Sequence, residues 1–166
     1  MKQSHKTGDR FVVKACSLQS HSISFMLTVS QDQLNEIHRH LEETYPEEGV
    51  GFLFGLEGNE TNVKALYPVP NAWQPEVERV RRYDVTPQNI IEADDKADEL
   101  GLVIIGAYHS HPDHPNEPSE TDRERAHPYF IYLITSVKEG KANGTRAWRL
   151  LDDRSKFIEE EIKITT

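Results

Sequence analysis

Two histidines at the end of an apolar segment are the side chains of this sequence best suited to metal chemistry. The apolar run 102–107 has the length of a buried strand, and His109 and His111 follow it closely. In an extended chain successive side chains alternate between two faces, so these two imidazoles should point the same way. Imidazole is a common zinc ligand, and the pair therefore predicts two ligands of one metal site.

A carboxylate further along the chain completes a candidate ligand set. Pro112 cannot continue a strand ladder, and a proline-rich loop leads to Ser119, where a helix is predicted to begin. Asp122 lies in the first turn of that helix and is a candidate third ligand. Two imidazoles and one carboxylate leave one position of a tetrahedral zinc ion for water, as in catalytic sites. The alternative is a strand end with two solvated histidines and an aspartate that only favours the helix dipole.

The spacing of these residues resembles a known motif. His109-Ser110-His111-Pro112, six residues, and then Ser119-Glu120-Thr121-Asp122 is similar to the pattern of the JAMM (MPN-plus) metalloproteases, in which His-x-His, ten residues and Asp bind zinc. The family also carries an upstream Pro-x-Glu-x-x-Gly-x-Leu-x-Gly segment, which matches residues 46–55 and aligns Glu48 with its glutamate. The resemblance covers about residues 24–136, and Val50 departs from it at a position where cysteine is common.

The resemblance implies a role for each matching residue. One zinc ion would be bound by His109, His111 and Asp122, and would lower the pKa of its bound water to about 7. Glu48 would take the proton from that water and pass it to the departing amine, although Glu47 is a competing base next to it. Ser119 would help to hold the tetrahedral oxyanion, and its hydroxyl is also a candidate N-cap for the helix that carries Asp122.

The function implied by the resemblance is cleavage of an amide or isopeptide bond after the C-terminus of a ubiquitin-like or sulfur-carrier protein, as in the free-standing prokaryotic members. The carrier's tail should bind by adding a strand to an exposed sheet edge. One rival is a non-catalytic scaffold of the same fold, which should lack the ligands. The other is a cupin-like metal enzyme using Glu117, which fits poorly with helices preceding the motif.

Composition restricts the class of protein. The chain has 166 residues, enough for one domain with a sizeable core, and its formal charge of −9 argues against a nucleic-acid surface. Cys16 is the only cysteine, so no intramolecular disulfide forms. Neither a signal peptide nor a membrane span is evident, and a cytoplasmic location follows by default, while the oligomeric state is left open.

The pattern of elements predicts an α/β or α+β fold, a mixed sheet sandwiched by helices, with the JAMM/MPN-like, cytidine-deaminase-like architecture that the resemblance implies. Residues 1–22 are an extension or an extra edge strand, and residues 23–166 form the domain. The expected strands are 24–29, 50–56, 62–69, 102–107 and 129–136, and the expected helices begin at Ser30, Thr86 and Ser119. Residues 145–152 and 156–164 form a closing hairpin, or a strand and a helix, after a turn at Asn143-Gly144.

Several other polar residues could bind a metal or a substrate, but simple exposure to solvent explains most of them. His38 and His40 lie on different faces of the first helix and are expected to be solvated. His114, Asp113 and Glu117 are candidates for a second metal or a substrate contact, but such loop residues are usually just exposed. Residues 70–82, with Trp73, should form a surface loop able to touch a ligand.

Overall fold

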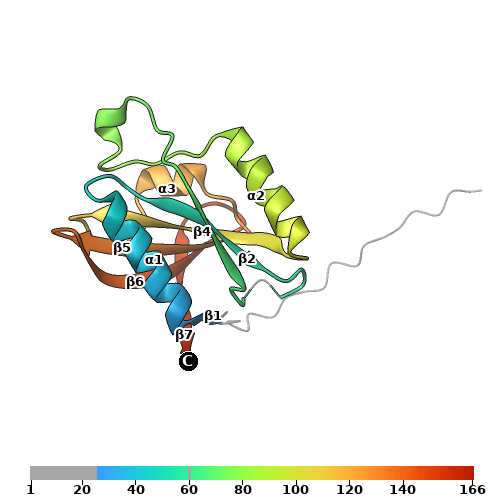
Figure 1. Cartoon of the computed structure of the whole chain (residues 1–166). Helices are drawn as coiled ribbons and strands as arrows, with labels where there is room; N and C mark the ends of the chain where they lie inside the picture. The colour runs from blue at the N-terminus through green and yellow to red at the C-terminus, as the bar shows by residue number, and fades with distance from the viewer. Residues whose placement is uncertain (1–25, 60) are drawn as a thin grey trace, which may run out of the picture.

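A mixed seven-stranded sheet forms the centre of the molecule in the computed structural model, which describes residues 26–59 and 61–166 (Figure 1). The strands lie in the order β1 (Met26–Ser30), β7 (Phe157–Thr165), β6 (Lys141–Leu150), β5 (Ile131–Lys138), β4 (Val103–Pro112), β2 (Val50–Gly55) and β3 (Ala65–Val69). The β4–β5 and β1–β7 pairs are parallel and the other pairs are antiparallel. The predicted mixed sheet is thus confirmed, and the proposed extension 1–22 lies outside the described residues.

The sheet curls until its two ends touch. Thr28 of β1 donates its backbone N–H to the carbonyl of Thr61 (2.7 Å), and the N–H of Val63 donates to the carbonyl of Thr28 (3.0 Å). The segment leading into β3 therefore meets β1, at the opposite end of the strand order. This contact satisfies backbone groups that an open edge would leave unpaired.

The helices start where the sequence predicts. α1 (Gln31–Thr44), α2 (Pro87–Glu99) and α3 (Glu120–Arg125) are each preceded by a capping box, formed by Ser30, Thr86 and Ser119 respectively. A short 3-10 helix, η1 (Glu76–Glu78), interrupts the long connection between β3 and α2. No helix of the described residues is long and apolar enough to cross a membrane.

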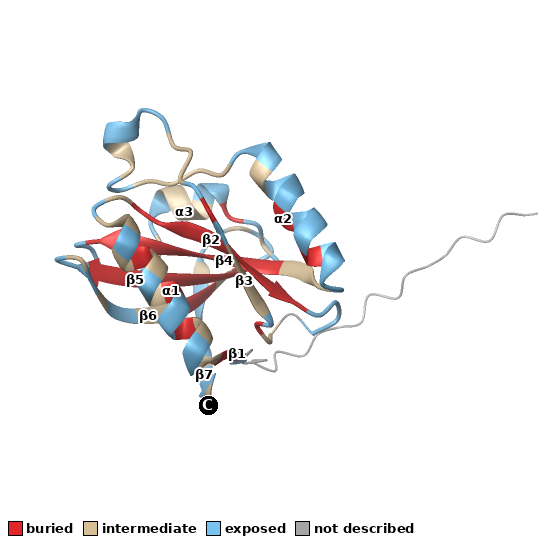
Figure 2. Cartoon of the chain, in the orientation of Figure 1, coloured by how far each residue is buried: buried red, intermediate tan, exposed pale blue. Residues whose placement is uncertain are grey.

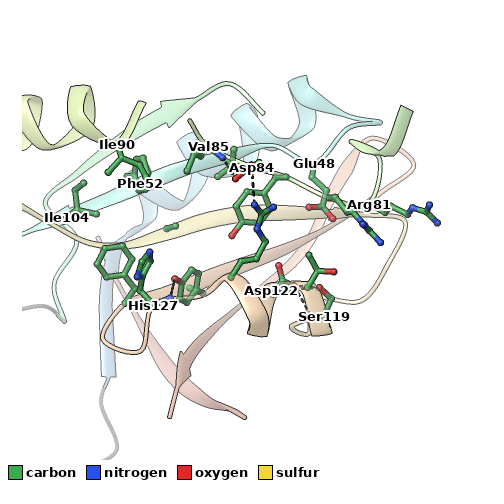
Figure 3. Close-up of a pocket in the computed structure, with 18 residues that line it drawn as sticks. Glu48, Phe52, Arg81, Asp84, Val85, Ile90, Ile104, Ser119, Asp122 and His127 are labelled. Carbon is green, nitrogen blue, oxygen red and sulfur yellow. Dashed lines mark hydrogen bonds and ion pairs between the residues drawn. The ribbon is translucent and has the colours of Figure 1, made fainter. Parts of the chain in front are cut away.

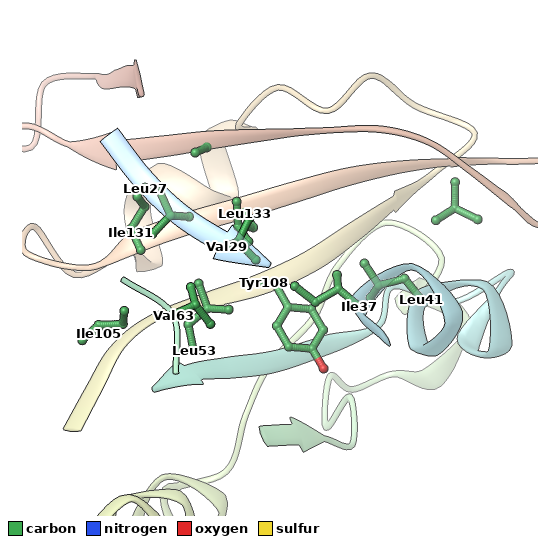
Figure 4. Close-up of a cluster of buried hydrophobic side chains, with 12 residues drawn as sticks. Leu27, Val29, Ile37, Leu41, Leu53, Val63, Ile105, Tyr108, Ile131 and Leu133 are labelled. Carbon is green, nitrogen blue, oxygen red and sulfur yellow. The ribbon is translucent and has the colours of Figure 1, made fainter. Parts of the chain in front are cut away.

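Helices cover the sheet on both faces, so the central strands are buried on both sides (Figure 2). On one face, Ile37 and Leu41 of α1 pack with Tyr108 of β4 in a core that continues to β1 (Figure 4). On the other face, Ala93 and Ala97 of α2 join a second core. This explains why β4 and β5 read as nearly continuous apolar runs.

A β-bulge in β4 decides which residues face which core. Leu53 of β2 pairs with Gly106, but the next residue of β2, Phe54, pairs with Ile104, so Ile105 is an extra residue in β4. Ile104 and Ala107 consequently both belong to the α2 side, while Ile105 lies on the α1 side. The alternation restarts from Ala107, so the side chains at 109 and 111 share its face.

The C-terminal part differs in detail from the sequence expectation. β6 and β7 form an antiparallel hairpin, which settles the alternative of a strand and a helix. The turn before β6 lies at Glu139 and Gly140, which both have positive φ, so the predicted turn at Asn143-Gly144 is wrong. Asn143 and Gly144 instead lie inside β6, where the register with β5 shifts.

The close approach of β4 and β5 predicts the effect of enlarging Gly106. A Cβ atom at this position would lie 2.0 Å from the carbonyl oxygen of Ile131, a backbone atom that cannot move aside. We expect Gly106→Ala to lower the free energy of unfolding by about 3 kcal/mol in urea denaturation. Gly58→Ala is the control, since a Cβ there meets nothing within 4 Å and only its positive φ costs about 1 kcal/mol. Equal losses for the two variants would contradict the steric explanation.

Candidate metal centre

The end of β4 places the two motif histidines together inside the protein. His109 is fully buried and His111 is 7% exposed, and their Nε2 atoms lie 3.1 Å apart. Both imidazoles face the α2 side of the sheet because they follow Ala107 at two-residue steps. Ser110, between them, points the opposite way, where its hydroxyl accepts a hydrogen bond from the N–H of Gly49 (2.9 Å).

Helix α3 brings Asp122 to the same point. Its Oδ1 lies 3.2 Å from Nε2 of His109 and its Oδ2 lies 3.3 Å from Nε2 of His111. One ligand atom of each of the three side chains lies within 4.8 Å of the others, close enough to share one metal ion. The structure thus brings together all three of the ligands expected from the sequence.

The six-residue helix that carries Asp122 is too short to be stable alone, and both of its ends are fixed by other groups. At the N-terminus, both the N–H and the hydroxyl of Ser119 donate to Oδ2 of Asp122, each over 2.7 Å. At the C-terminus, the guanidinium of Arg154 donates to the carbonyls of Arg123, Glu124 and Ala126. The position of the carboxylate is therefore set by contacts at both ends of α3.

The orientation of His111 is fixed by a carbonyl in the loop after β4. The Nδ1 of His111 donates to the carbonyl oxygen of Pro115 over 2.7 Å, which leaves the lone pair of Nε2 free for a metal. The loop itself is anchored by Ser136, whose hydroxyl donates to the carbonyl of His114, and by Trp148, whose Nε1 donates to that of Asn116. No pattern in the sequence points to these supporting contacts.

His109 is held by packing instead. Its ring lies against that of Tyr83, with 4.6 Å between the ring centres and an angle of 37° between the planes. Among the described residues its buried Nδ1 has no hydrogen-bond partner. Tyr83 comes from the segment before α2, far from the motif in sequence, and no pattern pointed to it.

The electrostatics of the site favour the protonation states that metal binding needs at two of the three groups, His109 and Asp122. Burial lowers the pKa of His109, so this imidazole is neutral at pH 7. Burial also opposes ionisation of Asp122, but the two neighbouring imidazoles outweigh it and hold the pKa of Asp122 well below its usual range. For His111, burial lowers the pKa, yet the hydrogen bond and charge of Asp122 prevail and raise it, so a metal ion that binds this imidazole competes with a proton. A neutral imidazole beside a carboxylate that stays ionised is a donor set suited to a divalent cation such as zinc.

Glu48 lies just before β2, on the cavity that Asp122 also lines (Figure 3), and it shares a second cavity with His111. Its side chain is buried, with only 5% of the residue exposed. Burial raises the pKa of Glu48 to about 8, against the opposing influence of His111 and with a further rise from the charge of Asp122. A buried carboxyl group with a raised pKa beside possible metal ligands is typical of a catalytic acid or base. Its neighbour Glu47, the competing base, does not line either of the two cavities that border the ligands.

Two cavities meet at the candidate metal centre. The larger, of about 510 Å³, extends from Asp122 toward α2 and has apolar walls that include Phe52 and Ile104 (Figure 3). The smaller, of about 370 Å³, lies beside His111 and the loop after β4. Glu48, Ser119 and Arg81 line both cavities, so an extended chain lying across the site would pass these three side chains.

Other residues considered in the sequence have structural roles. His38 and His40, expected to be solvated, are half-buried and bond to the hydroxyls of Thr145 (2.8 Å) and Tyr108 (2.9 Å), so that expectation is wrong. The guanidinium groups of Arg82 and Arg125 lie over the ring of Trp73, 5.2 and 4.7 Å from its centre.

The loop after β4 shows no second metal site. Asp113 accepts a hydrogen bond from the hydroxyl of Tyr45, and Glu117 pairs with Arg146. Within the described part of the chain, the only group of three possible ligands close enough to share an ion is that of His109, His111 and Asp122. The geometry therefore does not favour the cupin-like ligand set that includes Glu117.

The double contact of Ser119 with Asp122 predicts that Ser119→Ala weakens metal binding. We expect the affinity for Zn²⁺ to fall about 10-fold, since groups that orient a ligand typically contribute this much, together with about 1 kcal/mol of stability from the lost cap. Competition with a chromophoric chelator measures the affinity. Thr86→Ala, which removes the cap of α2, should cost similar stability and leave Zn²⁺ affinity unchanged. If both variants bound Zn²⁺ equally well, Ser119 would not orient Asp122.

Burial of Glu48 predicts a pH dependence of the metal-free protein. The folded-state pKa of about 8 exceeds the ordinary value of 4.5, so between these values the folded state holds a proton that the unfolded state has lost. This preference stabilises the fold at low pH and is lost as the pH rises through about 8, by a few kcal/mol in total. In Glu48→Gln this contribution is absent. In the presence of a chelator, the free energy of unfolding of the wild type should therefore fall relative to that of the variant as the pH rises from 4.5 to about 8. The free energy of unfolding of Glu47→Gln should depend on pH as that of the wild type does. If the difference in free energy between Glu48→Gln and the wild type stayed constant with pH, burial would not raise the pKa of Glu48.

Comparison with known proteins identifies the family. Residues 30–151 match the model of prokaryotic homologues of the JAB domain. The chain is 34% identical over 119 residues to a desampylase of Haloferax volcanii, covering 68% of this chain and 82% of the relative. It is 31% identical over 116 residues to a probable TtuB-protein conjugate cleaving protease of Thermus thermophilus, covering 68% and 74%.

Solved structures agree with the fold. A protein from Salinibacter ruber, determined in solution, is 42% identical with a TM-score of 0.66 and covers 84% of this chain and 92% of its own. A JAB1/MPN domain protein from Archaeoglobus fulgidus is 18% identical with a TM-score of 0.51 and shares the fold, covering 84% and 99%. The predicted JAMM/MPN-like architecture and the prediction of an isopeptidase-type hydrolase are confirmed. The chain therefore belongs to the prokaryotic homologues of the JAB domain, a family of JAMM-type hydrolases.

Proposed function

We propose that this protein is a zinc-dependent isopeptidase that cleaves the amide bond formed by the C-terminal carboxyl group of a ubiquitin-like or sulfur-carrier protein. The observation that carries the proposal is the convergence of His109, His111 and Asp122 on one point beside the buried Glu48. A scaffold without catalytic function would not need to keep two imidazoles and two carboxylates together out of water, where each must be compensated.

In this proposal His109, His111 and Asp122 hold one zinc ion. Zinc would supply a Lewis acid that polarises the substrate carbonyl and makes a bound water acidic. Glu48 takes the proton of the attacking water and delivers it to the departing amine. Burial raises the pKa of this carboxyl group, and a cation nearby would lower that pKa again, toward neutral pH.

Ser119 has a second proposed role besides orienting Asp122. Its side chain borders both cavities, so its hydroxyl can donate to the oxygen of the tetrahedral intermediate when it turns from Oδ2 of Asp122. Such a donor typically contributes on the order of 100-fold or more to turnover. The helix cap and the oxyanion role are compatible, because the backbone N–H of Ser119 still reaches the carboxylate.

The substrate class is supported by the relatives. One relative is named a desampylase and another a probable TtuB-protein conjugate cleaving protease, and the second name describes cleavage of a protein conjugate. An elongated site with cavities on both sides of Glu48 suits an extended tail on one side and an amine-bearing residue on the other. The carboxyl donor would be the carrier's C-terminus and the leaving group a lysine or N-terminal amine.

The test is to incubate the zinc-loaded protein with ubiquitin-like carriers bearing C-terminal extensions and to follow intact masses. We expect a mass loss that marks hydrolysis after the carrier's C-terminus, and a reduction on the order of 1000-fold in Glu48→Gln, which retains zinc but lacks the base.

Two controls accompany this test. A chelator should stop hydrolysis without unfolding the protein, since a core of this size does not require the ion to fold. Cleavage by Glu48→Gln at the wild-type rate would exclude Glu48 as the base, and cleavage that persists in chelator would exclude the metal.

A further inference from the structure

The backbone of Glu48 is not held by the sheet whose strand it precedes. Glu48 lies two residues before β2, outside the strand ladder, so its backbone polar groups need partners elsewhere. Its N–H donates to the carbonyl of Arg79 over 2.7 Å, and its carbonyl accepts from Nδ2 of Asn71 over 2.9 Å. Both partners belong to the long connection between β3 and α2.

Asn71 uses its whole amide group in this connection. Besides the carbonyl of Glu48, Nδ2 donates to the carbonyl of Arg82 (2.9 Å), and Oδ1 accepts from the N–H groups of Trp73 (3.0 Å) and Asp84 (3.3 Å). One half-buried side chain therefore satisfies four backbone groups, three from residues 73–84 and one from the candidate base. These hydrogen bonds close the segment 71–84 into a loop and attach it to Glu48.

The next residue along the chain is fixed from the opposite direction. The N–H of Gly49 donates to the hydroxyl of Ser110, and its carbonyl accepts from the N–H of Ser110 (3.1 Å). Ser110 lies between the two histidines, so Gly49 is tied directly to the metal-binding strand. Glu48 is thus placed by β4 on one side and by the 71–84 loop on the other.

We propose, on the basis of the function proposed above, that Asn71 is a positioning residue for the reaction, which holds the backbone of Glu48 so that its carboxylate faces the metal ligands. Among the described residues, the hydrogen bonds of the Asn71 side chain reach backbone groups and neither the candidate ligands nor the Glu48 carboxylate, so Asn71 acts through the main chain. Loss of this support leaves metal and substrate binding in place and misplaces the base, and small misplacements of a catalytic group are costly.

The test replaces Asn71 by Asp, which keeps the shape and the acceptor oxygen but removes both N–H donors, including the one that reaches Glu48. We expect kcat for a carrier conjugate to fall on the order of 10- to 100-fold, with KM and Zn²⁺ affinity within about twofold of the wild type. Asn71→Ala, which adds no charge, should show the same pattern. Asn89→Asp is the matched control, because its oxygen, which Asp retains, makes the contact with Thr86 that caps α2.

A double-mutant comparison shows whether Asn71 acts through Glu48. In the Glu48→Gln background, Asn71→Asp should cause no further loss of the residual single-turnover rate, since the group it positions is already gone. An equal fold-loss in both backgrounds, a loss confined to KM, or wild-type kcat in a folded Asn71 variant would overturn the proposal.

Amide hydrogen exchange tests the same inference without requiring turnover. In Asn71→Asp, the N–H of Glu48 should exchange faster than in the wild type, while the amides of α2 exchange unchanged. Unchanged protection at Glu48 would overturn the inference. If wild-type protein cleaved no carrier conjugate while Glu48 lost protection in the variant, the proposed function would fail and the structural role of Asn71 would stand.

Discussion

Keeping a carboxylate and two imidazoles together away from water is the constraint on which the rest of this structure depends. Each group loses hydration on burial, and only close mutual contact, or a shared cation, compensates for that loss. Asp122 therefore needs His109 and His111 within hydrogen-bonding distance. Holding three side chains this close together requires rigid support, which a central strand between two neighbours and a helix fixed at both ends provide.

The same burial acts in opposite directions on acids and bases around the centre. It keeps His109 neutral and therefore able to coordinate, and it makes Glu48 reluctant to ionise. A bound cation would lower the pKa of Glu48 and would favour the neutral form of His109 further, because positive charge stabilises a carboxylate and disfavours an imidazolium. The low-dielectric setting thus ties metal binding and the acid–base properties of Glu48 to each other.

The sequence was informative where the site is local and uninformative where it is assembled from distant parts. His109, His111 and Asp122 lie within one strand, one loop and one helix, so strand alternation and a capping pattern were enough to place them near each other. Glu48 lies far upstream, and only the family resemblance pointed to it. Asn71 and Tyr83 belong to an irregular segment whose fold is set by side chain to backbone hydrogen bonds, for which no periodic pattern exists.

Errors in the sequence-based view of the fold have similar causes. Asn143-Gly144 has the composition of a turn, but pairing with β5 carries the strand through it and moves the turn to Glu139 and Gly140. His38 and His40 lie on a helix that is amphipathic, and the partners that bury them come from β6 and β4. Local preference gave way to tertiary contacts in both cases.

The extra residue in β4 determines how the candidate metal centre of this chain could be lost. Because the bulge at Ile105 resets the alternation, the faces of all later side chains depend on a parity fixed upstream of them. A chain that kept every residue of this strand but paired straight with β2 beyond Ile104, without the bulge, would turn both imidazoles into the layer beneath α1 and bring the ring of Tyr108 round to the cavity. The sequence would still contain every ligand, but the ligands would no longer converge. An intact motif therefore indicates a metal centre only when the register of the strand that carries the two histidines is also kept.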